Sequence, residues 1–288
     1  MITALNIFKS VFCKVFAGLL ALIMTFSNGL NGIFNGNIYP YQSDSKVIGI
    51  ESLNRSQGVT TDGTAWYFSG KKAIVKIAFD NTTIIAANYN AITDEFKEKY
   101  GSAHIGGISY YNGMIYAPLE DSKKWEHPIV ALYDAQTLKY TGICKELPTE
   151  LLTRGVPWVA VDGERNLLYC SHSKSVEKLL CFDLDTLEYV KSIEIETPVS
   201  AIQGGEVYNG LLYVGTNDST RAVYTINPDN GKVEKLFDRI MYQPKLIDNF
   251  GGEGEDLTVY PMEDGTLIHA LDIGTLFIDS NLRHYVWE

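Results

Sequence analysis

The sequence is poor in cysteine and in positive charge. Its 288 residues hold four cysteines, and Cys13 precedes an apolar run near the N-terminus. No Cys-x-x-Cys, His-Glu-x-x-His or Gly-x-Ser-x-Gly motif occurs, so the sequence gives no support to the usual zinc sites or serine hydrolases. Lys and Arg total 24 against 35 Asp and Glu, for a net charge of -11. Nucleic-acid binders carry clustered Lys and Arg, so we expect no nucleic-acid partner.

Long hydrophobic runs are also scarce. The main one, Val15–Phe26, is shorter than the roughly 20 residues of a comfortable membrane span. Lys9 and Lys14 precede it, and this order is typical of a signal peptide. No clean Ala-x-Ala follows, so residues 1–28 are either a cleaved signal peptide or an uncleaved membrane anchor, and a buried helix is the alternative. We expect an extracytoplasmic protein that is secreted or anchored by this segment alone.

The remaining chain divides into a short lead-in and one domain. Residues 29–45 are rich in Gly and Asn and predict a linker, and residues 46–288 form the expected domain. Export permits disulfides, but only Cys144, Cys170 and Cys181 follow the N-terminal segment. Because this number is odd and the last two fall diagonally on neighbouring predicted strands, we expect three free thiols.

An imperfect sequence repeat runs through the domain. It reads QGVTTDGTAWYFSG at Gln57 and HIGGISYYNGMIYAPLED at His104. Further copies begin at Pro157, Ile202 and Gly254, about 45–52 residues apart, which is the spacing of propeller blades. Each copy predicts four strands with a tight turn after the first and an Asx-rich turn before the fourth.

The repeated pattern of strands and turns predicts an all-β fold, a five-bladed β-propeller of four-stranded antiparallel blades. A β-sandwich is the alternative, but it would not require the same pattern five times. The last copy, ending NLRHYVWE, is expected to have all four strands. Lys46–Leu53 then either adds an outer strand to that blade or replaces its last one, and both arrangements close the ring.

The pattern assigns loops to two faces. The tight and Asx-rich turns emerge on one face, and the longer links on the other, where function is expected. Residues that start the innermost strands should line the mouth of the central channel on that long-loop face: Gln57, His104, Trp158, Gln203 and Glu255 or Asp256. Such a ring suits a small ligand or a cation, although a water-filled channel would also be polar.

Acidic and aromatic side chains supply the candidate chemistry. Glu206, Glu120 and His104 are the candidate catalytic groups, for acid–base work. Glu253, Glu255 and Asp256 offer hard oxygen ligands for calcium, or form a solvated acidic loop. The candidate ligand-binding residues are Gln57, Trp158, Gln203, Arg154, Trp125 and His172. Trp158 beside Arg154 could bind a sugar or an anionic peptide.

The repeats over about residues 54–288 resemble exported bacterial propellers of the broad YncE-like group. The stretch GGEVYNGLLYVGTNDSTRAVYTINPDNGKVEKLFD from Gly204, with SQG at Ser56–Gly58, also resembles the plant-type glutaminyl cyclases, which are five-bladed propellers. That resemblance implies that Glu206 falls on a family acidic position. The family's NELE is QGGE here, and its GWGLT strand is VPWVAVD.

Together these features predict a propeller that binds a small ligand, a cation, or a protein or peptide partner on its long-loop face. The alternative is a propeller enzyme, with glutaminyl-cyclase-like amide chemistry or calcium-dependent hydrolysis at the channel mouth. A purely structural interaction module, which would respond to neither metal nor small molecule, stays a third possibility.

Overall fold

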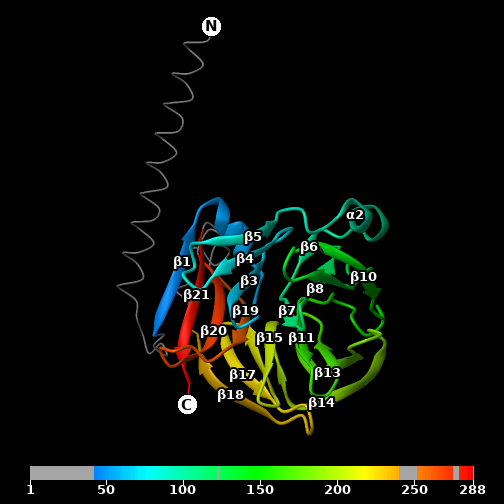
Figure 1. Ribbon diagram of the computed structural model, residues 1–288. Helices are drawn as coiled ribbons and strands as arrows, with labels where there is room; N and C mark the ends of the chain where they lie inside the picture. The colour runs from blue at the N-terminus through cyan, green and yellow to red at the C-terminus, as the bar shows by residue number, and fades with distance from the viewer. Residues whose placement is uncertain (1–41, 122–123, 240–251, 275–278, 288) are drawn as a thin grey trace, which may run out of the picture. The chain divides into compact units, whose positions relative to one another are not determined.

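A computed structural model describes residues 42–121, 124–239, 252–274 and 279–287. Their strands form five separate antiparallel sheets, as the repeats predict, and the protein is a five-bladed β-propeller (Figure 1). The predicted signal peptide or anchor, residues 1–28, lies outside the described residues, as does most of the predicted linker. None of the helices in the described ranges is both long and apolar enough to cross a membrane.

The first two blades follow the predicted order from the axis outward. The first contains β2 (Gly58–Thr61), β3 (Ala65–Ser69), β4 (Ile74–Ala78) and β5 (Ile84–Asn88). In the second, two short pieces, β6 (His104–Ile105) and β7 (Ser109–Tyr111), share the innermost position beside β8 (Met114–Glu120), β9 (Ile129–Asp134) and β10 (Tyr140–Glu146). Helix α2 (Asp94–Tyr100) links them and ends at Gly101 with φ 66°.

The next two blades are regular four-stranded sheets. The third contains β11 (Val159–Asp162), β12 (Leu167–Cys170), β13 (Val176–Asp183) and β14 (Tyr189–Val199). The fourth contains β15 (Ile202–Tyr208), β16 (Leu211–Thr216), β17 (Ala222–Ile226) and β18 (Val233–Asp238). Cys170 pairs with Leu180, and Cys181 pairs with Tyr169, so neither sulfur faces the other and both thiols are free.

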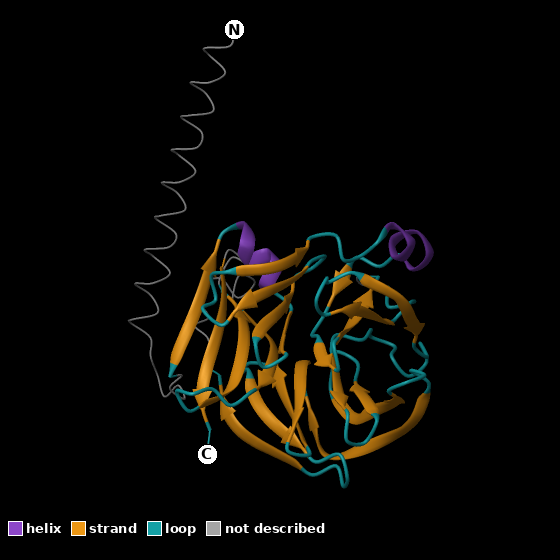
Figure 2. Ribbon diagram, viewed as in Figure 1, coloured by secondary structure: helices purple, strands orange, loops and turns teal. Residues whose placement is uncertain are grey.

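The fifth blade closes the ring with both ends of the domain. It contains β19 (Glu253–Val259), β20 (Thr266–Ile273), β21 (Asp279–Val286) and, outermost, β1 (Ser43–Ile48). The prediction that the last repeat holds four strands of its own is wrong, because its C-terminal stretch forms the third strand. β1 replaces the missing fourth strand, pairing Ser43 with His284 and Ile48 with Asp279. A 3-10 helix, η1 (Ile50–Arg55), then leads into β2 (Figure 2).

Local turn chemistry explains the repeats. In the Tyr-Asn-Gly turns, Asn112 and Gly113 have φ 47° and 81°, and Asn209 and Gly210 have φ 49° and 77°. Positive φ at both positions suits Asn-Gly and matches the twist of a hairpin. In the turn before β10, the Asp134 carboxylate accepts the amide N–H of Thr137 at 2.7 Å and its hydroxyl at 2.6 Å.

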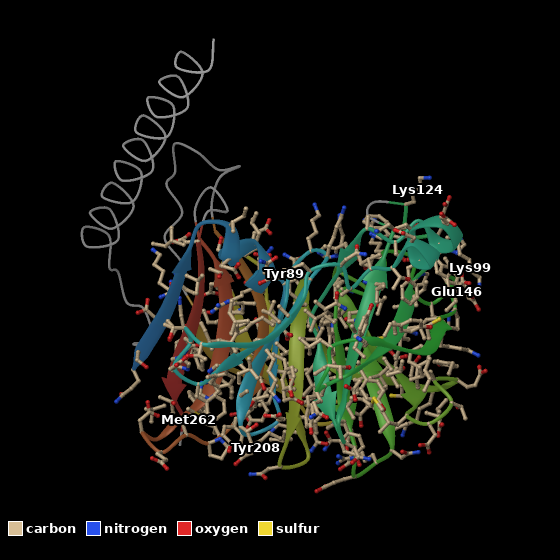
Figure 3. The ribbon with its side chains drawn as sticks, turned by 45° about the horizontal axis from the view of Figure 1, so that its top comes forward. Tyr89, Lys99, Lys124, Glu146, Tyr208 and Met262 are labelled. Atoms are coloured by element: carbon tan, nitrogen blue, oxygen red, sulfur yellow. The ribbon has the colours of Figure 1, made fainter. Side chains whose placement is uncertain are left out.

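The two predicted faces are separate. Figure 3 shows Tyr89 and Lys124, which lie in links between strands or blades, on one side of the propeller. Tyr208 and Met262, which flank tight turns, lie on the opposite side. Apolar residues such as Trp66, Phe96 and Phe182 fill the layers between neighbouring blades. The rigid layers therefore fix where the innermost strands present their side chains along the axis.

Candidate functional site

Three candidate residues meet where the innermost strands of the first two blades begin. Gln57 precedes β2, and His104 opens β6, where Glu120 of β8 is its cross-strand partner. The imidazole Nε2 of His104 donates to the carboxamide oxygen of Gln57. Its Nδ1 lies 3.6 Å from Oε2 of Glu120. With Nε2 directed at Gln57, the second ring nitrogen, Nδ1, faces the carboxylate of Glu120.

The other oxygen of Glu120 is unusual. Within the described residues, Oε1 is buried and has no hydrogen-bond partner. Gly155 lies against it with φ 77°, and a Cβ atom there would stand 1.9 Å from Oε1 and 2.8 Å from Cδ1 of Trp125. Leaving a buried carboxylate oxygen unpaired costs about 1–3 kcal/mol, so a donor that reached it would be bound tightly.

Trp125 lies near this oxygen, and Arg154 lies near the Trp125 ring. The Asp121 carboxylate accepts the backbone N–H of Trp125 at 2.7 Å and of Glu126 at 2.9 Å. These bonds hold Trp125 in a left-handed conformation with φ 55°. The guanidinium carbon of Arg154 lies 5.9 Å from the centre of the Trp125 ring. The next link contributes His172, whose pKa is lowered by burial and then by the charge of Arg154.

These contacts join six of the candidate residues in one group, which we call the mouth cluster: Gln57, His104, Glu120, Trp125, Arg154 and His172. The first three blades supply them. The cluster holds a hydrogen-bonded histidine, an unpaired carboxylate oxygen, an aromatic ring and a guanidinium. It can therefore accept a hydrogen bond, bind an anion and exchange a proton at neighbouring points.

Other candidates lie elsewhere. Trp158 is fully buried in the layer between blades, and its indole N–H donates to Oγ of Ser171 at 3.0 Å, so its ring packs the core. Gln203 is half-buried on β15, and its carbonyl oxygen lies against Gly107. Neither residue has a contact with the mouth cluster among the interactions that the structure describes.

Glu206 lies deeper along the axis, where it joins the blades. Its Oε2 accepts the hydroxyls of Thr60 at 3.1 Å and Thr258 at 3.2 Å, and its Oε1 accepts that of Ser109 at 3.4 Å. Ser109 in turn accepts the N–H of Val161. Innermost strands of all five blades thus meet around one carboxyl. Burial raises its pKa to about 7, and the three hydroxyls partly oppose that rise.

Asp256 is a second buried carboxyl with a structural role. It accepts three backbone N–H groups, from Val59 at 3.0 Å, Ile108 at 3.1 Å and Leu257 at 2.8 Å. Burial raises its pKa, and these donors partly counter the effect. Gly204 makes room for it, because a Cβ atom there would lie 1.8 Å from Oδ1.

The predicted calcium ligands do not form a metal site. The carboxylate oxygens of Asp256 accept backbone N–H groups from the first two blades and from its own strand. Glu255 is buried beside Glu253. Burial, followed by the charge of Glu253, holds the pKa of Glu255 well above its usual range. Across the described ranges, no group of three or more His, Cys, Asp or Glu side chains is arranged to hold a metal ion.

A buried arginine near these residues has no distinguishing pattern in the sequence. Arg239, which directly follows β18, is completely enclosed. Its guanidinium bonds Oδ1 of Asp272 at 3.1 Å and the carbonyl oxygens of Arg221, Thr216 and Glu255. Nothing in the repeat distinguishes Arg239 from an exposed arginine after a strand, because its burial depends on three neighbouring strands that enclose it.

Comparison with known proteins places the fold. No protein-family model matches the sequence, and neither does any of the curated proteins. Among solved structures, the chain is similar to the glutaminyl cyclase of Myxococcus xanthus, with a TM-score of 0.57 and 14% identity over 85% of this chain and 96% of that one. The hydrazine synthase of Kuenenia stuttgartiensis matches with a TM-score of 0.44 and 14% identity, over 82% of this chain and 59% of that one. The first likeness supports the five-bladed propeller fold.

Proposed function

We propose that this protein is an exported propeller that binds a small polar ligand, or the end of a peptide, at the mouth cluster. The buried, unpaired Oε1 of Glu120 is the observation that carries the proposal. A ligand N–H or O–H that reached this oxygen would satisfy it. Arg154, whose guanidinium lies near the Trp125 ring, and the neighbouring His172 suit an anionic or carbonyl group of the same ligand.

The side chains of the mouth cluster should contribute unequally to ligand binding. Glu120 provides the acceptor, and Gly155, which has no side chain, packs closely beside it. His104, whose Nε2 is held by Gln57, presents Nδ1 to the same ligand. Trp125 supplies a flat apolar wall in a fixed backbone conformation. Loss of the Glu120 acceptor should therefore weaken binding more than loss of any contact at the rim.

The experiment is a thermal-shift and calorimetric screen of the purified protein with amino acids, dipeptides, monosaccharides and phosphate esters. Glu120→Gln should weaken the binding of any compound that stabilises the wild type by roughly 10- to 100-fold, as expected for a lost bond to a charged group.

Glu146→Gln is the matched control, since Glu146 also pairs with a histidine, His127, at 2.7 Å, but in an exposed position. A compound that binds Glu120→Gln as tightly as the wild type would place its site elsewhere. If no compound of the panel shifts the midpoint, the small-ligand proposal fails in favour of an interaction module.

A second candidate is an enzyme with glutaminyl-cyclase-like chemistry, favoured by the His104–Glu120 pair and by the fold shared with the Myxococcus enzyme. In such a reaction the α-amine attacks the side-chain amide carbon of an N-terminal glutamine and ammonia leaves. Glu120 would take the amine proton and pass it, through Nδ1 of His104, to the leaving ammonia, so that both side chains end in their starting state. Glu206, the acidic position implied by the sequence resemblance, is enclosed by hydroxyls, so Glu120 is the better candidate. Ammonia release from a glutaminyl peptide, abolished by Glu120→Gln and retained by Glu146→Gln, would support this candidate.

A further inference from the structure

Exposed apolar side chains gather at one place on the propeller. Ten large apolar residues of the described chain are exposed. Six of them fall between residues 48 and 89, and we call these six the η1–β5 patch: Ile48, Ile50, Leu53, Ile84, Ile85 and Tyr89. Ile50 is the most exposed of all, at 79%. The other four are scattered over the second and third blades. Clustered apolar exposure of this kind marks a surface that another body covers.

Hydrogen bonds link the elements that carry the patch across the closure of the ring. Arg55, at the end of η1, donates to the carbonyl oxygen of Asn81 in the turn that precedes β5. The Asn81 carboxamide donates to Oγ of Ser45 on β1. Tyr89, at the other end of β5, lies close enough to Arg55 to influence its pKa, which burial lowers. The patch therefore spans the outer strand of the fifth blade, η1 and the outer strand of the first blade (Figure 1).

Basic side chains border the patch. The link after β3 begins with Gly70, which packs against the backbone of Leu53 and Asn54. Lys71 and Lys72 follow directly and are exposed. Aliphatic tips, a tyrosine and adjacent lysines are the composition of surfaces that lie at a lipid–water interface. In a chain with a net charge of -11, this pair of exposed lysines forms a local positive charge.

The order of the chain points to the same partner. The apolar run Val15–Phe26 ends only sixteen residues before β1 begins at Ser43. Even fully extended, sixteen residues span at most about 55 Å. A membrane that held the run would therefore keep β1 and η1 near its surface.

We propose that the η1–β5 patch rests on the lipid surface of the membrane, so that the propeller docks there with Ile50 and Leu53 dipping into the interface. This goes beyond anchorage by the N-terminal segment, because the folded domain itself supplies a second contact. Two weak membrane contacts on one chain bind much more firmly than either does alone.

Vesicle flotation tests the patch separately from the anchor. The fragment 42–288 contains every strand of the closed ring, and a single cooperative thermal transition would verify that it is folded. We expect it to float with phosphatidylethanolamine–phosphatidylglycerol vesicles. Ile50→Asp with Leu53→Asp should lower the floated fraction roughly tenfold or more, because two apolar contacts are lost.

Ile143→Asp is the matched control, since Ile143 is 51% exposed on the second blade, away from the patch. If the double variant fails to melt cooperatively, Ile50→Ser takes its place, because that side chain is almost free of contacts. Lys71→Gln with Lys72→Gln should weaken flotation with the anionic vesicles more than with pure phosphatidylcholine.

Three results would overturn the proposal: no flotation of the fragment, an equal loss in Ile143→Asp, or patch variants that change only the sedimentation of the protein. The last result would show that a second copy of the chain covers the patch.

Discussion

The Glu206 carboxyl at the axis should make the stability of the propeller depend on pH. Glu206→Gln removes its charge with little change in shape. Burial raises the pKa of Glu206 in the folded chain from its ordinary 4.5 to about 7. Between these values the folded state binds more protons than the unfolded state, so this carboxyl lowers the stability as pH rises from about 5 to about 7. The difference corresponds to about 3 kcal/mol.

The variant loses that dependence but also loses a hydrogen bond. Its amide oxygen can still accept from Thr60 and Thr258, whereas the Ser109 hydroxyl then faces an NH₂ group. That loss costs about 1 kcal/mol at every pH. We therefore expect Glu206→Gln to be about 1 kcal/mol less stable than the wild type at about pH 4 and about 2 kcal/mol more stable at about pH 8.

Urea denaturation of both proteins across this pH range measures the effect, because the contributions of all other titrating groups cancel in the difference. The exposed Glu146→Gln should give a difference that does not vary with pH. A constant difference for Glu206→Gln as well, or one that favours the wild type more at high pH, would refute the assignment of the raised pKa to Glu206.

Three further changes test the fold. Arg239→Met should lower the free energy of unfolding by about 3 kcal/mol, since Oδ1 of Asp272 and the buried carbonyl oxygens of Thr216 and Glu255 lose their donor while Oδ2 of Asp272 keeps Arg283, and calorimetry would detect a lower melting temperature. Gly204→Ala should destabilise by several kcal/mol, because its new methyl group would overlap the Asp256 carboxylate, whereas Gly113→Ala, with nothing within 4 Å, should cost only the strain of its positive φ. Deleting residues 42–48 should expose the edge of β21, and aggregation on heating, followed by light scattering, should set in at a lower temperature than for the full domain.

The sequence predicted the propeller because its repeats depend on local chemistry. Asn-Gly turns and Asx turns form wherever the chain carries those residues, so blade number and strand order followed from their spacing. Ring closure was less certain. The sequence left two arrangements open, and only the pairing of β1 with β21 decides between them.

The site was predicted in part for similar reasons. Gln57, His104 and Trp158 stand at or directly before the innermost strands β2, β6 and β11, and His104 meets Gln57 for that reason. Glu206 stands three residues beyond Gln203 on β15, which places it roughly 10 Å further along the axis. Trp158 differs because it forms an isolated bridge with Gly107 and turns its ring into the core. The contact of Gly155 with Glu120 depends on how one link folds over another blade, and no local pattern carries that information.

The pairing of β1 with β21 also fixes when the domain can be complete. The first strand to leave the ribosome has no partner until the last one has been made, so the ring cannot close on a growing chain. Until then β1 and the blade that awaits it stay open. The other four blades consist of strands that follow one another in the chain, so only the fifth blade waits for the C-terminal strand. Closure of the ring is thus timed by the synthesis of β21.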